Sequence, residues 1–238
     1  MLRTTVTLVG LMLLVCPCLR AQTTQPTLGK PPPAGAVVLF NGQDLSHWQS
    51  AKGEGKAIEW PIADNTLEVG PKTGDIVTKD KFEDCELHLE FRTPIPAEDD
   101  KGQHRGNSGV FLQGRYEIQI LESFGLPGSK GDCASVYSVI APSQNMALPP
   151  MEWQSYDMTF RAPRYDADEK KTENARLTLI WNGVKVHDNV EIPSPTRDHK
   201  AAEPPGPAPI NLQDHGFKVQ FRNIWVVPAV AAETTKEK

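Results

Sequence analysis

Apolar and polar residues alternate along much of this chain, and a period of two predicts β-strands rather than helices. In CELHLEFR (85–92) every second residue is apolar, and QSYDMTFR (154–161) alternates in the same way. The segments ARLTLIW (175–181) and VKVHDN (184–189) flank Asn182-Gly183, the dipeptide that a two-residue type I′ hairpin turn prefers. No helical period extends beyond about two turns. The pattern therefore predicts an all-β protein.

The number of short alternating segments narrows the fold class. FKVQFRNIWVV (217–227) adds another strand signal, and the chain contains 21 prolines. Many short strands separated by turns are typical of an antiparallel sandwich or barrel. Two long loops, 141–153 and 192–210, interrupt the pattern, and the second exceeds the usual loop length, which indicates a functional or a mobile segment. A single domain is the economical interpretation.

The two ends of the chain differ from the part between them. Residues 1–21 combine a basic residue, an apolar run too short to span a membrane, and a final small residue, which is the pattern of a cleavable secretory signal. Residues 22–35 are polar and proline-rich, so we expect a disordered linker there. The folded domain is expected over 36–228 and a flexible tail over 229–238. We therefore expect a secreted or periplasmic protein.

Removal of the signal changes the charge. Without Arg3 and Arg20 the chain keeps 23 basic and 30 acidic residues, a formal net charge of −7. An acidic chain without a basic tract argues against nucleic acid as a partner. No second apolar stretch is long enough to span a membrane, so no membrane span is expected in the mature chain.

The cysteines allow two interpretations. Cys16 and Cys18 leave with the signal unless one of them carries a lipid anchor, and neither follows the small residue that such a signal needs. Cys85 and Cys133 remain, and in an oxidising compartment they either form one disulfide or stay as two separate buried residues. No CxxC pair or Cys/His cluster is present, which argues against a structural zinc site.

The segment GNSGVFLQGRYEIQILE (106–122) places an unusual number of polar groups on a strand. Glu117 and Gln119 share one face by the period-two rule, and Glu122 joins them only if a bulge adds one residue. A solvated edge or a substrate groove explains these groups equally well. Further along, NLQDHG (211–216) gathers an amide, a carboxylate and an imidazole. Such groups suit a sugar, whose hydroxyls need hydrogen-bond donors and acceptors together.

Four segments, in this order, carry a resemblance to a known family. They are FNGQDLSHW (40–48), ELHLEFR (86–92), GNSGVFLQGRYEIQILES (106–123) and LQDHGFKVQFRNIWV (212–226). Together they resemble the secreted 3-keto-disaccharide hydrolase family over about residues 36–228. The resemblance implies a concanavalin-like jelly roll of two antiparallel sheets with a sugar groove. It also implies a small-molecule carbohydrate substrate whose C3 hydroxyl has been oxidised to a ketone by a separate sugar oxidoreductase.

The resemblance implies a set of site residues. The family motifs match Glu90 and Arg92, then Asn107, then Glu117 and Gln119, and finally Gln213, His215 and Arg222. Because the C3 ketone makes the C2 proton acidic, the reaction needs a base near C2, donors around the C3 oxygen and an acid at the glycosidic oxygen. We expect Glu117 or His215 to transfer protons, with Glu90 as a third catalytic candidate.

The remaining matched residues are expected to bind the substrate. Arg92, Arg222 and Asn107 would hold the ketone or hydroxyl oxygens, and Gln119 and Gln213 would supply further hydrogen bonds. An ion pair with a carboxylate is the alternative for Arg222. A divalent cation is left open, because no ligand spacing identifies a metal site.

Two rival functions remain. A retaining endoglucanase of the laminarinase type carries Glu-x-Asp-x-x-Glu on a bulged strand, and Glu117, Gln119 and Glu122 fall at the same offsets, although Gln119 replaces the Asp. A non-catalytic carbohydrate-binding module is the rival from another class, since jelly rolls also serve as lectins. Burial of Glu117 in a cleft would favour an enzyme, whereas full exposure would favour a binder.

Overall fold

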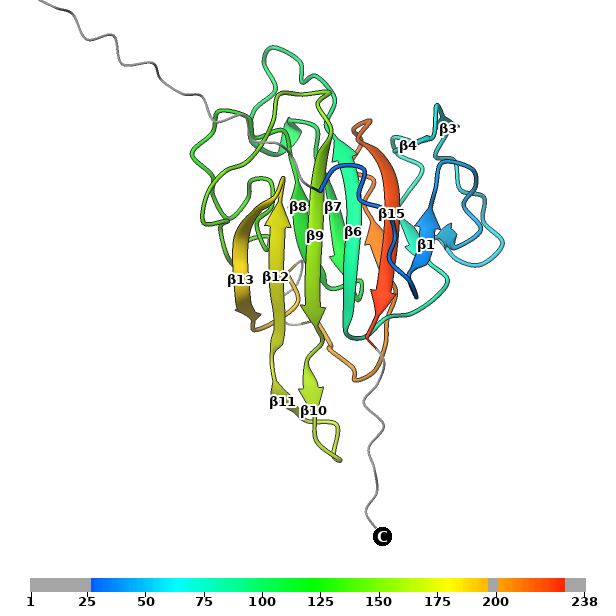
Figure 1. Ribbon diagram of the computed structural model, residues 1–238, viewed down its shortest axis with the longest axis vertical. Helices are drawn as coiled ribbons and strands as arrows, with labels where there is room; N and C mark the ends of the chain where they lie inside the picture. The colour runs from blue at the N-terminus through cyan, green and yellow to red at the C-terminus, as the bar shows by residue number, and fades with distance from the viewer. Residues whose placement is uncertain (1–26, 197–200, 230–238) are drawn as a thin grey trace, which may run out of the picture.

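The structure is a computed structural model that describes residues 27–196 and 201–229, so the expected signal at 1–21 lies outside the described residues. Two antiparallel sheets pack face to face (Figure 1). The strands of the large sheet are β1 (Val37–Phe40), β3 (Ile62–Ala63), β4 (Thr66–Glu68), β6 (Cys85–Arg92), β9 (Gln154–Arg161), β12 (Ala175–Trp181), β13 (Val184–Ile192) and β15 (Gln220–Pro228). Their order is β13-β12-β9-β6-β15-β4-β3, and β1 also pairs with β15.

The small sheet follows the order β2-β5-β14-β7-β8. Its strands are β2 (Trp48–Ser50), β5 (Ile76–Thr78), β14 (Asn211–Leu212), β7 (Ser108–Leu112) and β8 (Tyr116–Ile120). A separate ribbon joins β10 (Arg164–Tyr165) to β11 (Lys171–Glu173), and the single helical element of the described residues is a 3-10 turn, η1 (Gly102–His104). The predicted antiparallel sandwich is therefore confirmed. Within 27–196 and 201–229, no helix has the length and apolar character needed to cross a membrane.

The core lies between the sheets and is built from the apolar half of each alternating strand. On β6, Leu87, Leu89 and Phe91 are buried in this core, which places Glu90 on the opposite, outer face of the large sheet. On β8 the core residues include Ile118, so its polar neighbours point away from the large sheet. The two outer faces of the sandwich consequently carry different sets of polar side chains.

The β12–β13 hairpin turns where the sequence predicts it. Asn182 and Gly183 both have positive φ, 51° and 81°, as a type I′ turn requires. The turn also supports β9, because the Asn182 side-chain oxygen accepts a hydrogen bond from the Ser155 backbone N–H at 2.9 Å. A local turn signal thus also fixes the neighbouring strand.

Residues 27–33, here called the N-terminal strap, cross the outer face of the large sheet over β6 and β15 (Figure 1). The Gly29 N–H donates to the Glu90 carboxylate at 2.5 Å, and the Lys30 ammonium contacts Asp157 at 2.8 Å. The Lys30 carbonyl accepts a hydrogen bond from the Trp225 indole N–H. The expectation of a disordered linker is therefore wrong for this part of 22–35, because polar groups on the sheet give the strap specific partners.

Cys85 and Cys133 are both buried and both free. Cys85 is paired with Phe160 on β9, whereas the Cys133 sulfur contacts the Tyr156 hydroxyl at 3.1 Å. Phe160 and Tyr156 are separated by roughly 13 Å along the strand, and a disulfide needs Cα atoms within about 7 Å. The disulfide allowed by the sequence is therefore not formed.

Candidate functional site

A polar pocket lies on the outer face of the small sheet, over β7 and β8. The Tyr156 hydroxyl, which comes from the large sheet, donates to the Gln119 carbonyl at 2.8 Å. The core therefore lies on the side of β8 that faces the large sheet, and the pocket lies on the opposite side. Residues 134–137 continue the sheet beyond β8: the Ala134 N–H bonds the Gln119 carbonyl, and the Tyr137 N–H bonds the Glu117 carbonyl. The polar face of β8 is therefore not a solvated edge. It is the floor of a groove.

The pocket has a volume of about 190 Å³ and is lined by Gln103, Asn107, Glu117, Gln119, Tyr137, Gln213 and His215. Five of these residues are among those predicted from the sequence: Asn107, Glu117, Gln119, Gln213 and His215. The structure brings them together from β8 and from the segments next to β7 and β14. Glu117 is 4% exposed, Asn107 2% and Gln213 7%, whereas His215 is exposed at the rim.

Glu117 occupies the centre of the floor because Gly109 leaves room for it. A Cβ atom on Gly109 would lie 2.7 Å from Glu117 Oε1, closer than non-bonded atoms approach. The backbone around the carboxyl group is also fixed, since the Glu117 N–H donates to the Thr196 hydroxyl at 2.9 Å. Thr196 belongs to the long loop 192–210, so this part of the loop supports the site.

Gln103 connects the amide side chains of the pocket. Its Oε1 accepts hydrogen bonds from Asn107 Nδ2 at 2.8 Å and from Gln119 Nε2 at 2.9 Å. Its own amide nitrogen donates to the Gly131 carbonyl at 2.8 Å. Gln103 lies on η1, in a loop without strand periodicity, and no signal in the sequence marks it as a site residue.

Two buried acceptors in the pocket lack partners. Asn107 Oδ1 and Gln213 Oε1 have no hydrogen-bond partner within the described part of the chain. Buried polar atoms are nearly always hydrogen-bonded, so an orphaned acceptor on a residue that lines a cavity marks a place where a ligand or water donates. The pocket therefore suits a ligand with hydroxyl groups.

Glu122 does not belong to this pocket. It is buried, forms an ion pair with Arg105, and accepts the Phe124 N–H at 2.9 Å. A retaining glycosidase needs two carboxyl groups about 5–5.5 Å apart at the scissile bond. Among the residues that the structure describes, Glu117 is the one carboxyl group that lines the pocket, so these residues do not assemble the laminarinase-type arrangement.

Glu90, Arg92 and Arg222, which the resemblance assigned to the same site, lie on the opposite side of the sandwich. The alternation of β6 places Glu90 on the outer face of the large sheet, where it is paired in register with Arg222 on β15. The Arg222 Nε donates to Glu90 at 2.6 Å, which is the ion pair weighed as the alternative for Arg222. The expectation of one site that includes these three residues is therefore wrong, because their strands belong to the other sheet.

The surroundings of Glu90 are those of a structural ion pair. Burial alone raises the pKa of its carboxyl group, but hydrogen bonds from His88, Asn223, the Gly29 N–H and Arg222 outweigh that effect and lower the pKa to about 2. Nearby, the Arg92 and Arg222 guanidinium groups lie 4.7 and 4.1 Å from the Trp153 ring centre. Through Gly29, the Glu90 carboxylate also links the strap to the large sheet.

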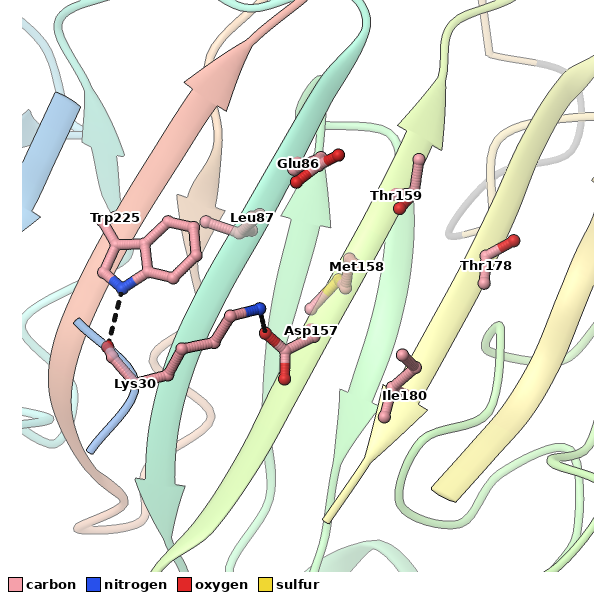
Figure 2. A pocket seen from close by; sticks show the side chains of 9 residues that line it. All are labelled: Lys30, Glu86, Leu87, Asp157, Met158, Thr159, Thr178, Ile180 and Trp225. Carbon is pink, nitrogen blue, oxygen red and sulfur yellow. Dashed lines mark hydrogen bonds and ion pairs between the residues drawn. The ribbon is translucent and has the colours of Figure 1, made fainter. Parts of the chain in front are cut away.

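A second hollow, of about 180 Å³, lies on this same face of the large sheet. Figure 2 shows Lys30 between Trp225 and Asp157, with Thr159 on the same strand as Asp157 and Thr178 on the neighbouring strand β12. None of the predicted catalytic or substrate-binding residues lines it. The hollow at Glu117 is therefore the candidate active site.

The pocket offers no preformed metal site. In residues 27–196 and 201–229, no three His, Cys, Asp or Glu side chains are grouped so that they could hold a metal ion. The pocket itself contains one carboxyl group and one imidazole, with amides around them.

The comparison with family models identifies the domain. Residues 35–227 match the model of the 3-keto-alpha-glucoside-1,2-lyase-like domain. The chain belongs to this family. The resemblance seen in the sequence motifs is thus confirmed, and the 3-keto-alpha-glucoside-1,2-lyase-like domain includes the whole pocket but not the N-terminal strap, residues 27–33.

Solved structures agree with the family and the fold. A candidate glycosyl hydrolase from Parabacteroides distasonis ATCC 8503 is 38% identical, with a TM-score of 0.74, over 82% of this chain and 84% of that chain. A second from the same organism is 20% identical (TM-score 0.60; 82% and 95% covered), and a third is 24% identical (TM-score 0.55; 81% and 98% covered). The last two show the fold alone. The 3-keto-alpha-glucoside-1,2-lyase-like domain is thus a glycosyl-hydrolase-like jelly roll. Among curated proteins none matches the chain.

Proposed function

We propose that this protein cleaves 3-keto-glycosides by elimination followed by hydration. The observation that carries the proposal is the buried Glu117 carboxyl group in a pocket whose lining amides Asn107 and Gln213 carry buried acceptor oxygens without partners. Membership of the 3-keto-alpha-glucoside-1,2-lyase-like family supports the choice of a 3-keto sugar. Glu117 acts as the general base toward C2, and His215 at the rim acts as the general acid toward the departing oxygen.

In the first step the Glu117 carboxylate removes the proton from C2, and the C2–H electrons form an enolate with the charge on the C3 oxygen. The enolate then re-forms the ketone while the C1–O bond breaks. This places a double bond between C1 and C2, and His215 protonates the departing oxygen. Water adds to C1 and a proton returns to C2, which yields the free 3-keto sugar and the alcohol. General acid and base groups of this kind contribute about 10²–10⁴-fold each.

The reaction is tested with a 3-keto-glucoside such as 3-keto-trehalose in deuterated water, with the unoxidised sugar alongside. We expect release of 3-keto-glucose labelled at C2 from the oxidised substrate only. Glu117→Gln should lower kcat by at least about 100-fold, whereas Glu86→Gln, an exposed glutamate on the large sheet, should not change it. Cleavage of an unoxidised glucan would replace the proposal with ordinary glycoside hydrolysis. Sugar binding without turnover of either sugar would make the protein a binding module.

We also place the protein outside the cytoplasm, on the ground of the signal pattern in residues 1–21. Its substrate would then come from a separate oxidoreductase that oxidises C3 of the glycoside. The first residue of the secreted protein, determined by mass spectrometry, tests this: a start at residue 22 supports the signal, and retention of residues 1–21 refutes it.

A further inference from the structure

The middle of the pocket and its two flanks differ in their hydrogen-bonding character, and backbone groups fix this difference. In the middle, Asn107 Nδ2 donates to both the Gln103 side-chain oxygen and the Gln103 carbonyl, at 2.8 and 3.1 Å. A backbone carbonyl can only accept, so the amide of Asn107 cannot turn over. Both of its N–H groups are used, and its oxygen is left as the unpaired buried acceptor.

The side-chain amide of Gln119 is also fixed in one orientation. Its Oε1 accepts the Ile120 backbone N–H at 3.1 Å, and its Nε2 donates to Gln103 Oε1 and to the Gly131 carbonyl, at 2.9 and 3.4 Å. Because Ile120 can only donate through this N–H and Gly131 can only accept through its carbonyl, this amide is fixed as well. Gln103 Oε1 therefore accepts one hydrogen bond from Asn107 and one from Gln119. We call Asn107 and Gln119 the amide wall.

The groups able to donate lie elsewhere in the lining. They are the Tyr137 hydroxyl, the His215 imidazole and the Gln213 side-chain amide, which stand on either side of the strands that carry the wall. A hydroxyl group of a sugar both donates and accepts, whereas a ketone oxygen only accepts. A ketone against the amide wall would meet acceptors alone and would leave them unpaired, which costs about 1–3 kcal/mol for each buried group.

From this we infer that Gln103 is a positioning residue that orients the substrate: a sugar hydroxyl lies against Asn107 and Gln119, and the C3 ketone lies against one of the flanking donors, Tyr137 or Gln213. The inference rests on the proposed function for the ketone, whereas the acceptor character of the wall applies to any sugar that binds. It places Tyr137 among the donors beside the oxygen on which the enolate charge develops.

The wall is tested with methyl α-glucoside and its analogues carrying fluorine in place of the hydroxyl at C2, C4 or C6. These sugars lack the ketone and bind without turnover, and fluorine cannot donate a hydrogen bond. In the wild-type protein we expect fluorine at one position to weaken binding at least about tenfold, measured by calorimetry or ¹⁹F NMR. At the other positions the change should be small.

Two substitutions of Gln103 separate positioning from packing. Gln103→Met removes the shared acceptor and frees the donors of Asn107 and Gln119, so the tenfold discrimination should fall to less than about threefold. Gln103→Glu keeps an acceptor oxygen for Asn107 and Gln119, although it loses the bond to the Gly131 carbonyl and adds a negative charge, so discrimination should persist. Equal discrimination in all three proteins, or none in the wild type, overturns the inference.

Tyr137→Phe tests the flanking donors. With 3-keto-glucosides we expect kcat to fall at least about tenfold, while the dissociation constant of methyl α-glucoside changes less than about threefold. An unchanged kcat for both Tyr137→Phe and Gln213→Leu overturns the ketone placement. His215 is left out of this test because it is also the proposed acid, and its loss would lower kcat wherever the ketone lies. The proposed function fails separately, if wild-type protein releases nothing from 3-keto-glucosides. Binding of no sugar at all overturns both.

Discussion

Glu90→Gln is the substitution that separates structure from catalysis most sharply in this protein. Glu90 is 1% exposed and accepts hydrogen bonds from the Gly29 N–H, Asn223 and Arg222. Gln keeps the shape of the side chain but removes its charge, so it resembles the protonated acid. The variant therefore measures what the ionised carboxylate contributes to the large sheet.

The magnitude follows from the pKa of the group. Burial raises the pKa of Glu90, but the hydrogen bonds of His88, Asn223, the Gly29 N–H and Arg222 lower it from 4.5 to about 2. A group whose folded pKa is depressed stabilises the fold above its unfolded pKa, and that stability disappears as the pH falls toward the folded pKa. The difference corresponds to about 3 kcal/mol above about pH 5.5, falling to about 1 kcal/mol near pH 3.

Urea unfolding of wild type and Glu90→Gln at several pH values between about 3 and 6 tests this value. The neighbouring His88 imidazole also responds to the charge of Glu90: burial lowers its pKa, but Asp157 and Glu90 outweigh that effect and raise it. We expect the variant to be less stable by about 3 kcal/mol at pH 6 and by only about 1 kcal/mol at pH 3. Glu86→Gln, on the same strand and exposed, should stay within about 0.5 kcal/mol throughout.

The kcat of Glu90→Gln, measured below its melting temperature, should equal that of wild type, because Glu90 lies on the face opposite the pocket. A stability difference that is independent of pH would refute the assigned pKa. A loss of kcat in a protein shown to be folded would return Glu90 to the active site.

Three further predictions follow from single features. Gly109→Ala should lower kcat at least about tenfold with little change in the unfolding midpoint, because the new Cβ, 2.7 Å from Glu117 Oε1, displaces the carboxyl group. Val110→Ala, on the core side of the same strand, should instead cost about 2 kcal/mol of stability and leave kcat unchanged. The reverse pattern would contradict the position of the pocket. A chain that begins at residue 36 should melt about 4–8 °C below one that begins at residue 27, since it loses the bonds of Gly29 and Lys30 to the sheet; equal melting would mean that the strap contributes nothing. Reductant should leave the melting temperature of the signal-free chain unchanged, and two thiols should react with a thiol reagent only after unfolding. The reason is that Cys85 and Cys133 are free and buried, and burial raises the pKa of each to about 12. A reducible disulfide bond would refute this prediction.

The sequence alone determined the local structure of this protein. The alternation in 85–92 and 154–161 corresponds to β6 and β9 residue for residue, and the hairpin turn occurs at Asn182-Gly183. These features depend on neighbours in the chain, since a period of two and a positive-φ dipeptide act over a few residues. Ordered motifs likewise indicated the family, and the grouping of Asn107, Glu117 and Gln213 came with it.

Only the tertiary structure decided which polar faces meet. Alternation shows that Glu90 and Glu117 each point away from a core, but pairing partners far along the chain assign β6 to the large sheet and β8 to the small one, so the two carboxyl groups lie on opposite sides. The roles of Gln103 and of the N-terminal strap were likewise decided only by the tertiary structure. Their roles arise from hydrogen bonds to residues distant in sequence, such as Gly131 for Gln103 and Glu90 for Gly29, and no local pattern encodes such contacts.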